Sequence, residues 1–213
     1  MSFGDDSMHS RDVLIIGCGA LAREIAALRR ANHWTALDVR CLPAELHNRP
    51  ERIVEAVRGE IRAHRDRYRT IFVAYADCGT GGRLDALLSE ENIERLPGAH
   101  CYEFFAGAPL FAALADAEPG TFYLTDFLLK HFDRLVTRGL GLDRHPELAG
   151  EYFRNYKKLV YLAQKRAPGA DERARRIAQD MGLAYELRDT GYGELGARLR
   201  VLLAREERPA WQH

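Results

Sequence analysis

The sequence has no excess of charge of either sign, because 31 lysine and arginine residues balance 31 aspartate and glutamate residues. A chain without surplus positive charge is not drawn to nucleic acid or to an anionic membrane surface. It also lacks an apolar run long enough to span a bilayer, and its polar start, Met1–Asp12, lacks the basic and apolar regions of a signal peptide. The sequence therefore predicts a soluble, cytoplasmic protein with no nucleic-acid or membrane partner.

Cysteine is scarce: the chain has four, and no two of them form a C-x-x-C pair. In an intracellular chain of this size, so few cysteines are a poor indication of disulfide bonds. They are better explained as reactive thiols, as metal ligands or as small residues packed in the core. Which of these applies is the central question that the sequence poses.

No stretch rich in proline, glycine or serine divides the chain. Apolar residues make up 46% of its 213 residues and charged residues 29%, a balance that is ordinary for a folded domain. We expect a single domain over residues 13–206, between a disordered N-terminal tail, residues 1–12, and a C-terminal tail, residues 207–213.

Short apolar, β-branched runs alternate with segments of helical spacing along the chain. The predicted strands are Val13–Ile16, Trp34–Leu42, Thr70–Ala76, Thr121–Leu124, Lys158–Gln164 and Leu183–Arg188. The predicted helices are Ala20–Arg30, a segment started by Asn48 and Pro50, Leu84–Ser89, Asp126–Arg138, a short one opened by His145 and Pro146, Asp171–Met181 and Glu194–Glu206. The run Ala99–Phe105 fits either a strand or the entry to a helix that reaches Ala117. The alternation predicts an α/β fold: a single-domain, three-layer, mostly parallel Rossmann-like sheet with helices on both faces.

Three of the cysteines stand where ligands collect in such a sheet. Cys18 and Cys78 fall in glycine-flanked turns at the ends of predicted strands, and Cys101 follows His100 just after a turn. A thiol near a helix N-terminus ionises readily, and thiolates from separate loops suit an iron–sulfur cluster or zinc. We expect Cys18, Cys78 and Cys101 to be the metal ligands. The residues expected around the cofactor are Gly17, Gly19, Asp77, Gly79 and His100.

Roles without a cofactor are also open. Cys18, Cys78 and Cys101 could instead pack in the core, where unpaired cysteine is common. Cys41 has neither glycine nor histidine beside it, and we expect it to be a core residue. His47 and His145 stand next to helix starts, which favours surface or capping positions.

The first turn supports a different hypothesis as well. Gly17-Cys18-Gly19-Ala20-Leu21-Ala22 satisfies the G-x-G-x-x-G/A fingerprint of dinucleotide-binding proteins. The acidic residue expected at the end of the second strand is replaced by Arg40 and Cys41, while Asp38 lies within the strand. An oxidoreductase that uses NAD(P) or flavin is therefore an alternative, and a cofactor-free interaction module is a third hypothesis.

Several turns of the chain resemble those of one protein family. They are Gly17-Cys18-Gly19-Ala20-Leu21, Ala74-Tyr75-Ala76-Asp77-Cys78-Gly79, His100-Cys101-Tyr102-Glu103-Phe104-Phe105-Ala106-Gly107, Gly120-Thr121-Phe122-Tyr123-Leu124-Thr125-Asp126-Phe127 and Asp189-Thr190-Gly191-Tyr192-Gly193. Together, from about Val13 to the C-terminal helix, they resemble the bacterial and archaeal family called domain of unknown function 1638.

The resemblance carries expectations about function. It implies that Cys18, Cys78 and Cys101 occupy recurring cysteine positions of the family. It also implies an association with corrinoid-dependent methyltransferase systems that act on methylated amines. The expected protein is thus a metal- or iron–sulfur-binding accessory or redox protein, with corrinoid methyltransferase components as its partners.

Overall fold

The computed structural model describes residues 13–206, so both expected tails lie outside the described residues. Every strand pair in it is parallel, which confirms the α/β class. The strands form two sheets instead of one, with the orders β2-β1-β3-β4 and β5-β6-β7. The described chain divides into two compact units, residues 13–100 with 196–206 and residues 101–195. That residues 13–206 form a single domain stays a prediction.

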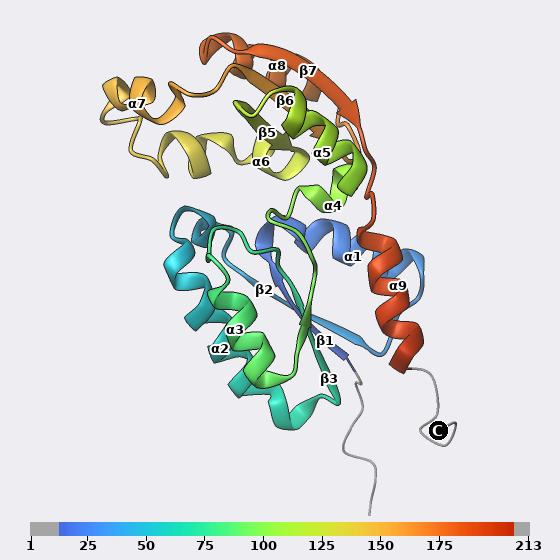
Figure 1. Cartoon of the computed structure of the whole chain (residues 1–213). Coiled ribbons are helices and arrows are strands. Elements are labelled where there is room, and N and C mark those ends of the chain that lie inside the picture. Colours follow the sequence, from blue (N-terminus) through green and yellow to red (C-terminus); the bar gives the residue numbers. More distant parts are fainter. Residues whose placement is uncertain (1–12, 207–213) are drawn as a thin grey trace, which may run out of the picture. The chain divides into compact units, whose positions relative to one another are not determined.

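The first unit is a three-layer α/β sandwich. Its main elements are β1 (Val13–Cys18), α1 (Ala22–Ala31), β2 (Leu37–Leu42), α2 (Ile53–His64), β3 (Thr70–Ala74), α3 (Arg83–Glu91), β4 (Glu94–Arg95) and α9 (Leu195–Glu206), with short 3-10 turns at Gly19–Leu21, Ala44–Asn48, Pro50–Arg52 and Arg65–Arg67. Helices α2 and α3 lie on one side of the sheet, and α1 and α9 lie on the other (Figure 1). All six residues of β1 are buried, because β1 has a strand on each side and helices over both faces.

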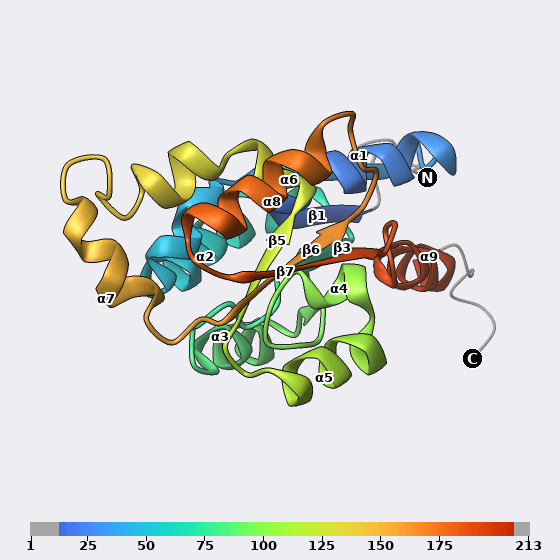
Figure 2. The same cartoon turned by 90° about the horizontal axis from the view of Figure 1, so that it is seen from above.

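The second unit repeats this layering around its own sheet. Its elements are α4 (Glu103–Ala106), α5 (Ala108–Ala117), β5 (Thr121–Thr125), α6 (Asp126–Lys130), a π-helical turn (Asp133–Thr137), a 3-10 turn (Pro146–Leu148), α7 (Ala149–Phe153), β6 (Lys158–Ala163), α8 (Ala170–Asp180) and β7 (Ala184–Asp189). Along β6, Tyr161 and Ala163 pack into the cluster that includes α8, whereas Val160 and Leu162 pack with Leu114 of α5. This alternation matches the period of a strand covered on both faces, with α6 and α8 on one side and α4 and α5 on the other (Figure 2).

Most predicted elements are present, with three differences. The helix predicted over Asp126–Arg138 is interrupted, because α6 ends at Lys130 and a π-helical turn follows. The run Ala99–Phe105 enters helix α4 and is not a strand. The two-residue strand β4 pairs with β3 and was not expected. Within residues 13–206, no helix is long and apolar enough to cross a membrane.

Candidate functional site

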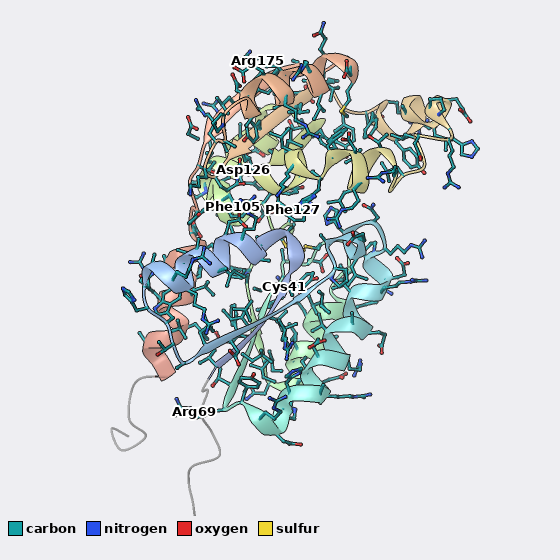
Figure 3. The ribbon with its side chains drawn as sticks, turned by 180° about the vertical axis from the view of Figure 1, so that it is seen from behind. Cys41, Arg69, Phe105, Asp126, Phe127 and Arg175 are labelled. Atoms are coloured by element: carbon teal, nitrogen blue, oxygen red, sulfur yellow. The ribbon has the colours of Figure 1, made fainter. Side chains whose placement is uncertain are left out.

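Two of the three cysteines predicted as metal ligands lie at the carboxyl edge of the first sheet. Cys18 is the last residue of β1, and Cys41 in the neighbouring β2 is in register with Gly17 (Figure 3). On the other side of β1, Gly17 is in register with Ala74, the last residue of β3, and Cys78 follows four residues later. Because the three strands are adjacent and parallel, the turns that carry Cys18 and Cys78 emerge side by side.

The segment that connects β2 to α2 packs against both of these turns. A Cβ atom at Gly19 would lie 2.9 Å from the carbonyl oxygen of Leu42 and 3.2 Å from the amide nitrogen of Ala44. A Cβ atom at Gly79 would lie 3.4 Å from the ring of Pro50. The connecting segment therefore passes close to the Cys18 turn at its start and to the Cys78 turn at its end.

This segment brings His47 to Cys78. The two side chains are hydrogen-bonded, and this bond is the main reason why the pKa of His47 is raised above its ordinary value. Partial desolvation of the imidazole opposes the shift, whereas negative charge on Cys78 and then on Cys18 adds to it. His47 is exposed, as expected of a surface residue, but it is also a member of the cysteine site, which the sequence interpretation missed.

A second cation, Arg95, feels the charge of Cys78. Arg95 donates hydrogen bonds of 2.6 and 2.8 Å to the carboxylate of Asp85, and this is the main cause of its raised pKa; the charges of Asp85, Asp77 and Cys78 add to the effect. Cys78 itself is buried and has a left-handed backbone with φ of 48°. Positive charge on the hydrogen-bonded His47 favours the thiolate form of Cys78.

The other two cysteines of the edge differ from Cys78 and from each other. Cys18 is buried, and its sulfur accepts a hydrogen bond from the amide of Ala20 at 3.5 Å. Cys41 was expected in the core, and this prediction is wrong, because Cys41 is exposed at the end of an outer strand. Partial desolvation and then the charge of Cys18 raise the pKa of Cys41 to about 11. Cys41 is therefore a protonated thiol at neutral pH.

Asp77 holds the glycine turn that follows it. Its carboxylate accepts hydrogen bonds from the Thr80 hydroxyl at 2.7 Å, the Gly82 amide at 2.9 Å and the Gly81 amide at 3.1 Å. These bonds, with that from Gly82 the strongest, lower the pKa of Asp77 to about 2. The amides at the start of α3 are thus already bound by a carboxylate of the chain itself, and Asp77 shapes the turn around Cys78.

The glycines of the first turn also have roles within the fold. Gly17 lies in the buried strand β1, and Gly19 has no room for a side chain because Leu42 and Ala44 approach it closely. In a dinucleotide-binding turn the second glycine makes room for the pyrophosphate. In this protein the backbone of Leu42 and Ala44 occupies the space beside Gly19. Asp38, the nearest acid on β2, accepts a 2.7 Å hydrogen bond from the hydroxyl of Tyr68.

His100 and Cys101 lie where the two units join along the chain. Ala99 accepts a 2.8 Å hydrogen bond from the amide of Cys78, which ties the segment before His100 to the Cys78 turn. Cys101 is the first residue of the second unit, half-buried in the turn before α4. That Cys18, Cys78 and Cys101 bind one metal stays a prediction. In the part of the chain that the structure describes, no three or more histidine, cysteine or acidic side chains form a group that could hold a metal ion.

A polar network occupies the carboxyl edge of the second sheet. The carboxylate of Asp126, directly after β5, accepts hydrogen bonds from the Tyr161 hydroxyl at 2.6 Å and from the amides of Lys165 at 2.8 Å and Gln164 at 3.3 Å. The Gln164 side chain in turn accepts a 2.9 Å bond from the Asp126 amide. Asp126, which Figure 3 labels at the start of α6, thus fixes the loop after β6.

Comparison with known proteins gives one match. The family model described as a protein of unknown function, DUF1638, matches residues 41–199. The chain belongs to this family. The match begins at Cys41, so the DUF1638 region includes Cys78 and Cys101, while the turn around Cys18 precedes it. No curated protein and no solved structure matches the DUF1638 chain significantly.

Proposed function

We propose that this DUF1638 protein is a cysteine-dependent redox or accessory protein whose reactive group is the thiolate of Cys78. The hydrogen bond between Cys78 and His47 carries the proposal. The thiolate is the nucleophilic and redox-active form of cysteine, and an imidazolium partner is a common means of stabilising it. Arg95 adds a second positive charge, and the Asp77-bonded turn holds Cys78 in place.

A metal-dependent form of this hypothesis would need side chains that can bind the metal together. Two thiols and an imidazole at one sheet edge are soft ligands of the kind that zinc and iron–sulfur clusters use. However, no group of three suitable side chains among residues 13–206 is arranged to hold a metal ion. The described arrangement therefore does not fit a metal by itself.

The biological setting rests on the family resemblance alone. We propose the cytoplasm as the location and corrinoid-dependent methyl transfer from methylated amines as the pathway that the protein serves. A thiolate in such a system would handle electrons or an electrophilic group for corrinoid methyltransferase components. Binding of the purified partners to the wild-type protein, and its loss in Cys78→Ser, tests this setting.

The test of the thiolate is the pH dependence of alkylation in the full chain. We expect iodoacetamide to modify Cys78 at pH values well below the ordinary cysteine pKa of about 8.5. Replacing His47 by Gln should slow the reaction of Cys78 at pH 7 about tenfold, because a thiolate loses its cation. Mass spectrometry of the digested protein measures the alkylation of each cysteine separately. Burial of Cys78 slows its alkylation in the wild type and in the variants alike, so the ratio of their rates reports the effect of His47.

A matched control is available at His145. This histidine is also exposed and is paired with Glu147, far along the chain from the cysteines. His145→Gln should leave the alkylation of Cys78 unchanged. If Cys78 reacts only above the ordinary thiol pKa, or if His47→Gln behaves like His145→Gln, the proposal is wrong.

Metal analysis tests the alternative directly. Protein purified without oxygen would be assayed for iron, zinc and acid-labile sulfide and examined by visible spectroscopy. Iron with sulfide that is lost in each of Cys18→Ser, Cys78→Ser and Cys101→Ser would establish the three-cysteine cluster predicted from the sequence. Zinc at about one ion per chain would instead indicate a thiolate metal site.

A further inference from the structure

The second sheet ends in a strand that has a neighbour on one side only. Among residues 13–206, β7 pairs with β6 and with no other strand, so its far side is an edge of the sheet. Helix α8 lies to one side of β7 and α5 to the other (Figure 2). With six residues, β7 is as long as the longest strands of the fold. An outer strand of this length is a place where a further strand can pair.

The hydrogen bonds to β6 show which residues of β7 face outward. The amide of Ala184 donates to the carbonyl of Lys157 at 3.0 Å, and the amide of Thr190 donates to the carbonyl of Ala163 at 2.9 Å. Along a strand, successive residues direct their N–H and C=O groups to opposite sides. The even-numbered residues from 184 to 190 therefore face β6, and the outer edge carries the backbone groups of the residues between them: Tyr185, Leu187 and Asp189.

The two side chains that flank Leu187 carry opposite charges. Glu186 and Arg188 lie two positions apart, so both point to the same face of the sheet. Arg188 is exposed and contacts one carboxylate oxygen of Glu186, while Lys158 of β6 binds the other oxygen at 2.9 Å. The outer edge thus presents a negative and a positive charge on either side of Leu187.

We propose that a second copy of this chain pairs with the outer edge of β7, antiparallel and about a two-fold axis at Leu187. The two three-stranded sheets then form one sheet of six strands. Leu187 pairs with Leu187 of the partner subunit, and Tyr185 pairs with Asp189 of the partner subunit. Every outward backbone group from Tyr185 to Asp189 thereby gains a hydrogen-bond partner. This interface goes beyond the proposed thiol chemistry and does not depend on it.

Charge complementarity selects this register. With the axis at Leu187, Glu186 lies opposite Arg188 of the partner subunit, and these are non-hydrogen-bonded pairs, in which the side chains come closest. An axis at Glu186 would place two glutamates opposite each other, and an axis at Arg188 would do the same with two arginines. Charges on an edge strand usually prevent pairing with foreign strands. On β7 they exclude both of these registers and favour the one between them.

The same edge is used in both copies, so the pairing stops at two. A two-fold contact of this kind leaves neither β7 edge open to a third copy. We therefore expect a dimer in solution and not an open chain of subunits.

Charge reversal in the full chain tests the interface. Light scattering after gel filtration should give the wild type twice the mass of the chain at micromolar concentration. Arg188→Glu places like charges opposite each other in both pairs, so the dissociation constant should rise about tenfold or more. Glu186→Arg should have the same effect. An equimolar mixture of the two variants restores opposite charges in both pairs, so the variants should dimerise with each other.

Arg154→Glu is the matched control. Arg154 is also an exposed arginine that pairs with a nearby glutamate, Glu151, but it follows α7 and is not on β7. This variant should dimerise as the wild type does. Amide hydrogen exchange gives a second readout, because the outward amide of Leu187 should exchange slowly in the wild-type dimer and rapidly in Arg188→Glu.

Four results would each overturn the inference. They are a monomeric wild type, an Arg188→Glu variant that dimerises as tightly as Arg154→Glu, rapid exchange of the Leu187 amide in the dimer, and a mixture of folded variants that stays monomeric. Glu186→Arg also loses the ion pair with Lys158, so circular dichroism must verify its fold. If it does not fold, Arg188→Glu and the exchange of the Leu187 amide still decide the question.

Discussion

A Cβ atom at Gly193 would lie 2.2 Å from the carbonyl oxygen of Phe104. The same carbonyl accepts a 2.8 Å hydrogen bond from the amide of Glu194. The turns Asp189–Gly193 and Cys101–Gly107, which belong to two of the stretches that resemble the family, thus meet within the second unit. Gly193 also has a left-handed backbone with φ of 50°, so both its conformation and its surroundings require glycine.

We predict that Gly193→Ala destabilises the protein by about 3 kcal/mol or more, because the new methyl group has no space beside the Phe104 and Phe105 backbone. Gly191→Ala is the matched control. Gly191 also has a positive φ, but nothing lies within 4 Å of an added Cβ, so the cost should be only about 1 kcal/mol. Urea unfolding of both variants measures the difference. Equal losses would show that the contact with Phe104 is unimportant.

Asp77 should make stability depend on pH in acid. Because its pKa is lowered to about 2 from an ordinary value of 3.8, its contribution is present above pH 3.8 and is lost as the pH falls through about 2. Asp77→Ala should cost about 1–2 kcal/mol at pH 7 and flatten this part of the stability curve. Asp77→Asn keeps an acceptor oxygen and should lose less at pH 7. A curve for Asp77→Ala as steep as that of the wild type would contradict the assignment.

The Tyr161 hydroxyl should stabilise the second unit. Tyr161 is fully buried, and burial raises its pKa, with a further increase from the hydrogen bond to Asp126. Tyr161→Phe should lower the free energy of unfolding by about 1.5–3 kcal/mol, since the partly buried carboxylate of Asp126 loses a donor. Tyr185 is half-buried and makes the same kind of 2.6 Å bond to Asp171, so Tyr185→Phe should cost less. Thermal and urea unfolding of the two variants provide the comparison.

The first turn should not bind a dinucleotide. Since the backbone of Leu42 and Ala44 fills the space beside Gly19, we expect NAD(P) and flavins to leave the melting temperature unchanged at millimolar concentration. Purified protein should likewise carry no flavin absorption. A concentration-dependent rise in melting temperature would revive the oxidoreductase hypothesis and would require the segment after β2 to move.

The sequence predicts the elements of this fold well but not their pairing. Apolar runs such as Thr70–Ala76 and Lys158–Gln164 identify strands because each strand is buried on both faces. The same pattern does not reveal which strands are neighbours, and no change of composition marks the boundary between His100 and Cys101. Strand β4 is only two residues long and polar, so it has no pattern to detect.

The candidate site was predicted in part. Glycine-flanked turns after strands correctly placed Cys18 and Cys78 at one sheet edge. His47 was missed because its contact with Cys78 depends on how the segment after β2 folds back, which local spacing does not encode. The close approach of Pro50 to Gly79 shows that this segment returns to the turn that carries Cys78. A search for histidines between the second strand and the second helix, where loops reach the same edge, would have included His47.

The last helix has a consequence for how the protein is made. Helix α9 belongs to the first unit, where Gly196 packs against Leu28 of α1, although the whole second unit precedes it in the chain. A ribosome releases the strands that carry Cys18 and Cys78 long before it releases α9. The nascent first unit therefore stays incomplete, with part of one apolar face uncovered, until the whole second unit and then α9 have been synthesised.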